Sequence, residues 1–179
     1  MRGLALALAL GLAAGAARAQ VDETLDEAFE AAPAAVSAED RAVLTGCLRD
    51  AADMPRACIG AIAVVCARRA PGSPAEAGLE VTCSRREAGA WRERLDLVGG
   101  ALGARLESGP RSRFAATQRA WETYAVQKCA FAAEMQRPDR ASAMEAGCAL
   151  REVATRAIEM ERLAARPAER PGQRPMIQR

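Results

Sequence analysis

The sequence predicts an all-α protein: a small bundle of about four to five helices that disulfides hold together, followed by a flexible tail rich in Arg and Pro. Apolar residues recur at helical spacing through most of residues 37–165. β-Branched residues are few, and nowhere do they alternate with polar residues over the length of a strand. The chain also has six cysteines, and an even number is typical of a disulfide framework in an exported protein.

The N-terminus has the pattern of a secretory signal peptide. Arg2 supplies a positive charge, residues 4–12 form an apolar run, and residues 17–19 form a small-x-small cleavage site. The alternative is a membrane anchor, but a spanning helix needs roughly 20 apolar residues and this run is shorter. We therefore expect cleavage after Ala19 and a periplasmic or secreted protein. No later stretch is long and apolar enough to span a membrane, so we expect no span in the mature chain.

Charge is balanced over the mature chain but unevenly placed along it. The full chain has 25 basic and 23 acidic residues, and cleavage removes Arg2 and Arg18, which leaves the mature chain formally neutral. This balance argues against nucleic acid or an anionic membrane as the main partner. An acidic segment occupies residues 20–36, and residues 166–179 form a basic tail that we expect to be disordered.

Two helices are predicted before the clearest loop of the chain. Ser37 and Asp40 have the spacing of a capping box, so the first helix begins there and ends near Asp50. Pro55 interrupts the chain because a proline disfavours helix in the residue before it. We expect a second helix from Pro55 to Arg69, and then a loop over residues 70–74.

A long third helix is expected from Pro74 towards Leu106. Ser73 and Glu76 form a second capping box at its start. A bend or break is plausible at Gly99-Gly100, since each glycine costs about 1 kcal/mol relative to Ala in a helix. The apolar stripe of this helix comprises Trp91, Leu95, Val98, Leu102 and Leu106.

The last two helices are separated by a break near Arg137-Pro138. The fourth opens at Pro110, and the fifth spans about residues 139–165. On the fourth helix the apolar residues fall near one face, which we expect to pack inward: Phe114, Trp121, Ala125, Cys129 and Ala132, with Tyr124, Phe131 and Met135 beside them.

Neighbouring cysteines flank the predicted turns. Six cysteines allow 15 pairings, but an antiparallel pair of helices brings together cysteines on the two sides of its turn. We therefore expect the pairs Cys47–Cys58, Cys66–Cys83 and Cys129–Cys148. Each bridge closing a loop of this size is worth roughly 3 kcal/mol in the chain-entropy model, which matters for a core poor in aromatic residues.

The residue types that are missing exclude most catalytic and metal sites. The chain has no histidine and no Cys-x-x-Cys motif, which removes the commonest general base, the Cys-His zinc and haem patterns, and thioredoxin-type exchange. Its acidic residues are spread along helix surfaces, commonly beside arginines, rather than paired as in a glycosidase. We therefore expect no enzyme, no metal site and no cofactor.

Three residues near the last two cysteines allow two interpretations. Trp121 and Tyr124 would suit a binding platform, because aromatic residues anchor interfaces. The interpretation we favour places both in the core of the helix pair, with the Tyr hydroxyl reaching a polar partner. Arg156 is either a functional arginine or, as we favour, a buried brace paired with a carboxylate.

These residues form a pattern that resembles the LprI-type domain, the lysozyme-inhibitor-like family of small exported bacterial proteins. The pattern consists of an Ala-Trp-x-x-Tyr element, a cysteine, a loop, a second cysteine and a Thr-Arg pair. In this chain these are Ala120, Trp121, Tyr124, Cys129, Cys148, Thr155 and Arg156. The resemblance covers most of residues 58–163, and it implies an all-helical envelope domain, which we assign to residues 37–165.

The resemblance also implies a function, which is inhibition of lysozyme by surface binding. The chain departs from the family pattern at Ala125-Val126, where members commonly carry Arg-Asp, and at residues 136–140, where they carry a Gly-Gly-Ser-type loop. Lysozymes are generally basic, so an inhibitor benefits from an acidic surface, which the segment 20–36 would offer. The alternative is a structural or adaptor protein that binds another envelope protein through its helical faces or its tail.

Overall fold

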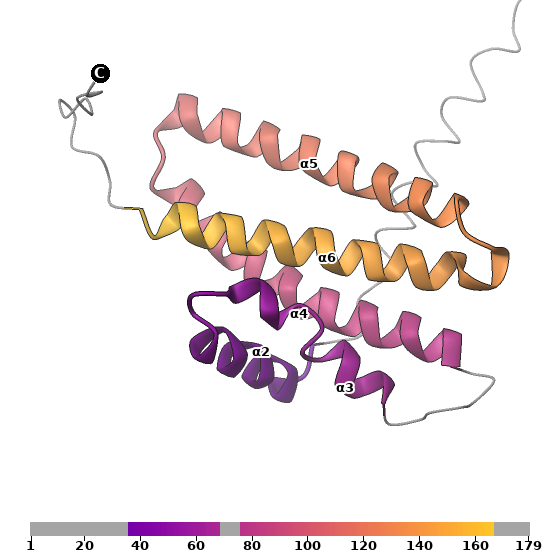
Figure 1. Ribbon diagram of the computed structural model, residues 1–179. Coiled ribbons are helices and arrows are strands. Elements are labelled where there is room, and N and C mark those ends of the chain that lie inside the picture. The colour runs from indigo at the N-terminus through magenta and orange to yellow at the C-terminus, as the bar shows by residue number, and fades with distance from the viewer. Residues whose placement is uncertain (1–35, 69–75, 167–179) are drawn as a thin grey trace, which may run out of the picture. The chain divides into compact units, whose positions relative to one another are not determined.

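The computed structural model describes residues 36–68 and 76–166, which all belong to one compact unit. The predicted signal peptide, almost all of the acidic segment 20–36, the loop over residues 70–74 with the Ser73 cap, and the tail from residue 167 lie outside these ranges. The elements of the described part are all helical, which confirms the all-α fold class: α2 (Ala38–Asp50), the 3-10 helix η1 (Pro55–Cys58), α3 (Ala63–Ala67), α4 (Glu76–Ala104), α5 (Ser108–Glu134) and α6 (Pro138–Ala164) (Figure 1). None of these helices is long and apolar enough to cross a membrane.

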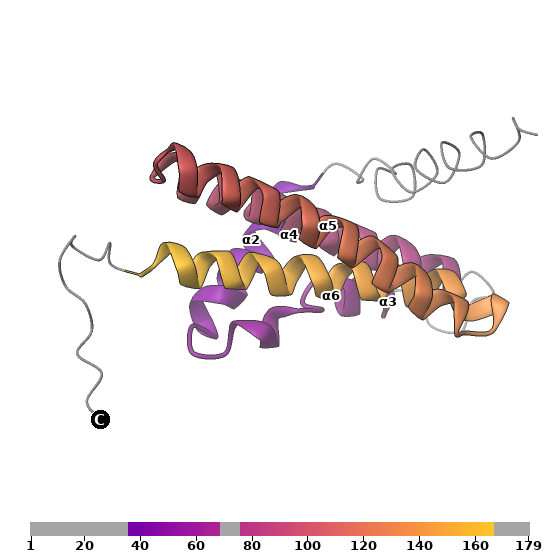
Figure 2. The ribbon, with the colours of Figure 1, turned by 90° about the horizontal axis from the view of Figure 1, so that it is seen from above.

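Three long helices form the body of this unit. Helices α4, α5 and α6 follow one another through short turns and run side by side in both ribbon views (Figures 1 and 2). Helix α6 has extensive contacts with both of the others, whereas α4 and α5 touch only slightly. Helices α2 and α3 pack on α4. One side of α6 packs against α4, and a second side packs against α5.

The core lies between α4 and α6. Trp91 and Leu95 of α4 are fully or almost fully buried, and Val98 and Leu102 pack against them, as the predicted stripe requires. The face of α6 that meets them is apolar throughout and consists of Leu150, Val153, Ala154, Ala157, Ile158 and Met160. Burial of this apolar surface is the main force that holds the two helices together.

The prediction of one continuous helix from Pro55 to Arg69 is wrong in its middle. It divides into η1 and α3, and Gly60 between them has a φ of 104°, which a residue without a Cβ adopts at little cost. The cause is Glu87 of α4, which is fully buried. Its carboxylate accepts hydrogen bonds from the backbone N–H groups of Gly60 at 2.7 Å, Ile62 at 2.9 Å and Ala63 at 2.7 Å. These donors therefore start a new, short helix instead of continuing the first one.

Helix α2 begins where the sequence predicts and is tied to α4 by ion pairs. The Ser37 hydroxyl accepts from the backbone N–H of Asp40 at 3.1 Å, which caps the helix. Asp40 is buried, and Arg86 donates to both of its carboxylate oxygens at 2.8 Å. The Arg86 hydrogen bond, opposed by burial and supported by Ser37, lowers the pKa of Asp40. Arg41 and Glu93 form a second, more exposed pair at 2.7 Å.

The structure also differs from the sequence prediction at a suggested break in α4 and at the start of α5. Helix α4 continues through Gly99-Gly100 without a break. Leu95 before the glycines and Leu102 after them both pack into the core that α4 shares with α6, which keeps the helix continuous through them. Helix α5 begins at Ser108, two residues before Pro110. Pro110 therefore sits in the first turn, where its missing N–H would have no partner within the helix.

Each disulfide joins two consecutive helical elements. Cys47–Cys58 links α2 to η1, Cys66–Cys83 links α3 to α4, and Cys129–Cys148 links α5 to α6, with Cα–Cα distances of 5.8, 5.6 and 5.4 Å. These are the pairs expected from the positions of the turns. All six cysteines are paired.

Candidate binding surface

Trp121 and Arg156 meet between α5 and α6. The Arg156 guanidinium lies 5.6 Å from the centroid of the Trp121 ring, a cation–π distance. Its Nε donates to Oε1 of Gln118 at 2.8 Å, its Nη2 donates to the same oxygen, and its Nη1 lies 3.1 Å from Oε2 of Glu159. The side chain of Arg156 is 14% exposed, so the residue is partly buried and links α6 to α5. The amide of Gln118 is its cross-helix partner, whereas its carboxylate partner Glu159 lies on its own helix.

The same indole also connects α5 to α4. Arg92 of α4 places its guanidinium 5.6 Å from the Trp121 centroid and its Nη1 3.1 Å from Oε1 of Glu122. Trp121 is partly buried and packs against the hydrophobic core. It therefore has the structural position we favoured for it, where all three long helices come close. Thr155, the remaining motif residue, is partly buried on α6 next to Arg156.

Tyr124 differs from the expectation, because its side chain lies on the surface and not in the core. It is 56% exposed, and the ammonium group of Lys128 lies 5.7 Å from the centroid of its ring. Lys128 is in turn held by Glu152 of α6 at 2.6 Å. This ion pair is the first cause of the raised pKa of Lys128, and Tyr124 adds to it. The motif therefore divides into a partly buried Trp that packs against the core and an exposed Tyr.

Two further large apolar residues lie exposed on the same helix. Phe131 is 62% and Met135 is 69% exposed, and their separations from Tyr124, seven and eleven residues, place all three on one face of α5. The small residue Ala120 and the polar residue Gln127 complete the row and are also exposed. We call these five residues the α5 outer face: Ala120, Tyr124, Gln127, Phe131 and Met135.

The sequence predicts these apolar residues beside the buried face, and the contacts between α5 and α6 explain why they are exposed instead. The positions of α5 that are buried are Ala125 and Cys129. Both side chains are small, so α5 approaches α6 closely there, and the large side chains Tyr124 and Phe131 near the C-terminal end of α5 remain outside. The signal in the sequence was a row of small residues, Ala125, Cys129 and Ala132, at helical spacing beside the larger ones.

The end of α5 that carries this face is well braced. Cys129–Cys148 joins it covalently to α6, Lys128 pairs with Glu152, and Arg140 at the start of α6 lies 3.2 Å from Glu80 of α4. The turn between the two helices is exposed from Met135 to Pro138. The α5 outer face and this turn therefore form a continuous, braced surface.

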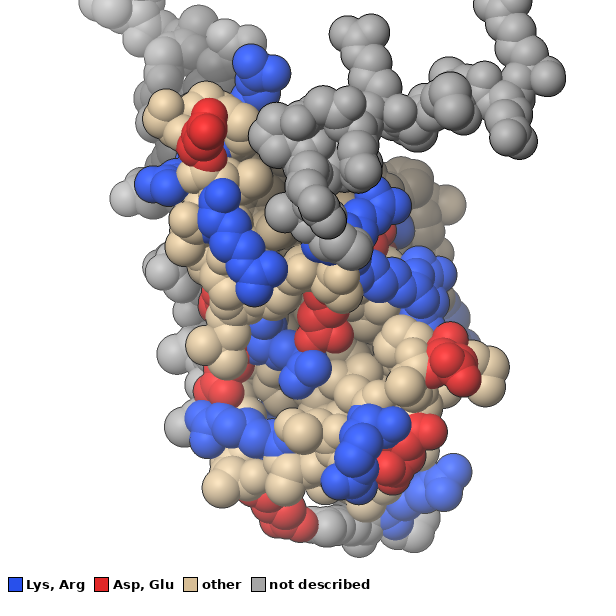
Figure 3. All heavy atoms as spheres, turned by 90° about the vertical axis from the view of Figure 1, so that its left-hand side faces the viewer, with Lys and Arg blue, Asp and Glu red and all other residues tan. Residues whose placement is uncertain are grey.

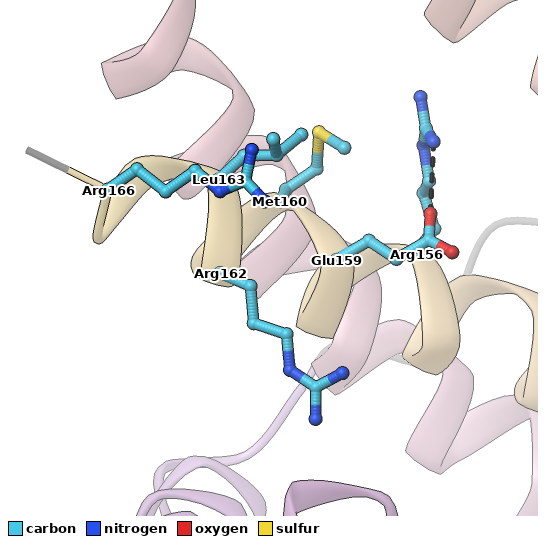
Figure 4. A pocket seen from close by; sticks show the side chains of 6 residues that line it. All are labelled: Arg156, Glu159, Met160, Arg162, Leu163 and Arg166. Carbon is cyan, nitrogen blue, oxygen red and sulfur yellow. Dashed lines mark hydrogen bonds and ion pairs between the residues drawn. The ribbon is translucent and has the colours of Figure 1, made fainter. Parts of the chain in front are cut away.

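The opposite end of the three long helices is basic. Arg105 and Arg111 donate to backbone carbonyls at the ends of α6 and α4, and Arg113, Arg162 and Arg166 are exposed nearby. Figure 3 shows basic side chains spread over this face among fewer acidic ones. An open hollow of about 300 Å³ lies here along the last turns of α6, with Met160 and Leu163 on one side and Arg162 pointing away from them (Figure 4).

The described residues offer few groups placed for catalysis or metal binding. Within residues 36–68 and 76–166, no group of three or more His, Cys, Asp or Glu side chains is placed to hold a metal ion. Burial raises the pKa of Asp96, which Arg92 lowers and Glu122 raises further. Glu122 is itself paired with Arg92, whose guanidinium lies over Trp121, so Asp96 experiences both charges of this ion pair.

Comparison with known families decides what kind of domain this is. A family model described as lysozyme inhibitor LprI matches residues 66–160, just over half of the chain. The chain belongs to the LprI family. The matched LprI region contains the Cys66–Cys83 and Cys129–Cys148 disulfides, Trp121, Tyr124 and Arg156, whereas α2 and Cys47–Cys58 precede it. No curated protein and no solved structure matches the chain.

Membership of the LprI family and the disulfides together bear on location and activity. Three disulfides persist only where thiols are oxidised, so they indicate an extracytoplasmic protein. The family is described as lysozyme inhibitor LprI, so membership suggests a non-catalytic, lysozyme-inhibitor-like role.

Proposed function

We propose that the mature chain, released after Ala19 into the periplasm or the medium, inhibits lysozyme by binding to its surface. The observation that carries this proposal is the LprI family match over residues 66–160. The fold suits such a role, because three disulfides and the Glu87 hydrogen bonds order the helices before any partner binds. A surface that is already ordered loses little conformational entropy on binding.

The distribution of charge limits where a basic enzyme can bind. The mature chain is neutral overall, but residues 20–36 carry five acidic and no basic side chains, whereas the far ends of α4 and α6 are rich in arginine. Attraction between unlike charges speeds association and sets orientation. We expect lysozyme to approach the molecule away from its basic end.

The proposal is tested with the oxidised mature protein, residues 20–179, titrated into a turbidity assay of cell-wall lysis with several lysozyme classes. Dose-dependent inhibition is expected. A sample that is reduced, alkylated and freed of reductant before mixing serves as the control and should lose the effect. Absence of inhibition at high micromolar concentration, with helical content verified by circular dichroism, would refute the proposal.

The alternative, a structural or adaptor protein of the envelope, is favoured by one observation. Ala125, at a position where related domains commonly carry Arg, is buried against α6, so this chain presents no charged side chain there. Deletion of residues 166–179 separates the alternatives further. Loss of an envelope partner with lysozyme inhibition intact would indicate that the tail binds that partner independently.

A further inference from the structure

The α5 outer face has the composition of a protein-binding surface. Tyr124, Phe131 and Met135 are each more than half exposed, and they lie along one side of α5 and its C-cap. Aromatic residues and Met are enriched at protein interfaces, and a few such anchors supply most of the binding energy. In a chain with only six aromatic residues, leaving a Tyr and a Phe outside the core removes apolar surface that would otherwise stabilise the domain.

The ring of Tyr124 is held in place before binding. Lys128 contacts it from the next turn of the helix, and Glu152 of α6 fixes Lys128 from the other side. Directly after Lys128, the disulfide at Cys129 prevents α5 from moving away from α6. An anchor that is already ordered binds with a smaller entropy cost.

The two ends of α5 differ in charge. Around the α5 outer face the cations Lys128, Arg137 and Arg140 are all paired with carboxylates, and Glu134 is exposed beside them. At the other end Arg113, Arg162 and Arg166 are exposed and form no ion pair within the described residues. A basic partner is repelled from that end and is accepted by the face at Tyr124 and Phe131.

We propose that lysozyme, a generally basic enzyme, binds to the α5 outer face and the adjoining turn at Met135–Pro138. This proposal rests on the proposed function and assigns that function a surface. Tyr124 and Phe131 are the anchors, and the paired cations around them leave no net positive charge to oppose the enzyme.

The first test compares single substitutions in the lysis assay. Tyr124→Ala and Phe131→Ala should each raise the half-inhibitory concentration about tenfold or more, the change expected for an interface anchor. Leu97→Ala is the matched control, because Leu97 is also a large apolar residue, 77% exposed, but lies on α4. It should leave inhibition unchanged, and all three variants should keep the helical content and melting temperature of the wild type.

The second test examines the charge of the partner with a pair of variants at one site. Gln127 is exposed in the middle of the α5 outer face. Gln127→Glu should strengthen inhibition and Gln127→Lys should weaken it, by about threefold to tenfold between the two, and salt should reduce the difference. The same pair at Ala101, which is exposed on α4, should give a smaller difference.

The possible outcomes separate the two proposals. If the wild type inhibits lysozyme and Tyr124→Ala, Phe131→Ala and Leu97→Ala all inhibit equally, the assigned surface is wrong while the proposed function stands. If the wild type does not inhibit at all, the proposed function fails and the surface falls with it. If sedimentation shows a dimer that Phe131→Ala dissociates while inhibition stays unchanged, the face binds a second copy of the chain, which also overturns the proposal.

Discussion

The two sides of α6 are built differently. On the side of α4, helix α6 meets the large buried side chains of Trp91 and Leu95. Near them, the buried Glu87 carboxylate of α4 accepts hydrogen bonds from four donors. Against α5, helix α6 meets small residues, Ala125 and Cys129, together with one stacked Trp-Arg pair. The large side chains of α5 near its C-terminal end point outward instead.

This difference separates stability from recognition. The α4 side has the apolar burial and the satisfied polar groups that hold a domain together. The α5 side relies on a disulfide and on close approach of small residues, and therefore leaves a helix face available for a partner. Substitutions on the two sides should accordingly have very different effects on the free energy of unfolding.

The largest expected effect is at Glu87. Glu87→Ala leaves the buried backbone N–H groups of Ile62 and Ala63, the partly buried N–H of Gly60 and the Trp91 indole N–H without their acceptor. Each such group costs about 1–3 kcal/mol, so we expect a loss of at least about 4 kcal/mol in urea unfolding. Glu87→Gln retains one acceptor oxygen and should lose clearly less. A loss below about 1 kcal/mol for Glu87→Ala would show that the carboxylate does not organise the region from Gly60 to Ala63.

The two tryptophans give a direct comparison of the two sides. Trp91→Ala should destabilise by about 3–5 kcal/mol, as expected for a fully buried aromatic residue. Trp121 is only partly buried and stacks on guanidinium groups, so Trp121→Ala should cost roughly half as much or less. Equal losses in chemical unfolding would mean that the α5 side contributes as much to stability as the α4 side.

A smaller effect, which depends on pH, is expected at Asp40. Because Arg86 lowers its pKa in the folded state, its contribution is fully present above the unfolded pKa of about 3.9 and is lost as pH falls through the lower folded value. Asp40→Asn should therefore cost about 1–2 kcal/mol near pH 7 and progressively less as the pH is lowered below about 4. Glu93→Gln, which breaks the exposed pair with Arg41, is the control and should have a much smaller effect at every pH. A cost of Asp40→Asn that does not vary with pH would exclude the ion pair as its origin.

The smallest effect on stability is expected on the α5 outer face. Phe131→Ala removes a large side chain that is 62% exposed, and exposed substitutions of this kind usually change the free energy of unfolding by less than about 0.5 kcal/mol. The measurement is thermal and urea unfolding beside the wild type. A loss of 2 kcal/mol or more would place Phe131 in the core in solution and remove the basis for assigning the face to a partner.

The sequence by itself determined the helical class, the main helix ends and the pairing of the cysteines. Ser37 supplies a cap, Pro138 opens a new helix, and Trp91 and Leu95 repeat at helical spacing. Such signals are local, because they act within one or two turns of chain. The cysteine pairs were equally accessible, since each lies on the two sides of one turn.

Only the tertiary structure decided where the second predicted helix divides and which side of α5 is covered. Glu87 interrupts the helix near Gly60 from 27 residues away, and no local pattern shows where a distant carboxylate will lie. The exposure of Tyr124 and Phe131 depends on how closely α6 approaches Ala125 and Cys129. Helical spacing shows which residues share a face, but the neighbouring helix determines which face is buried.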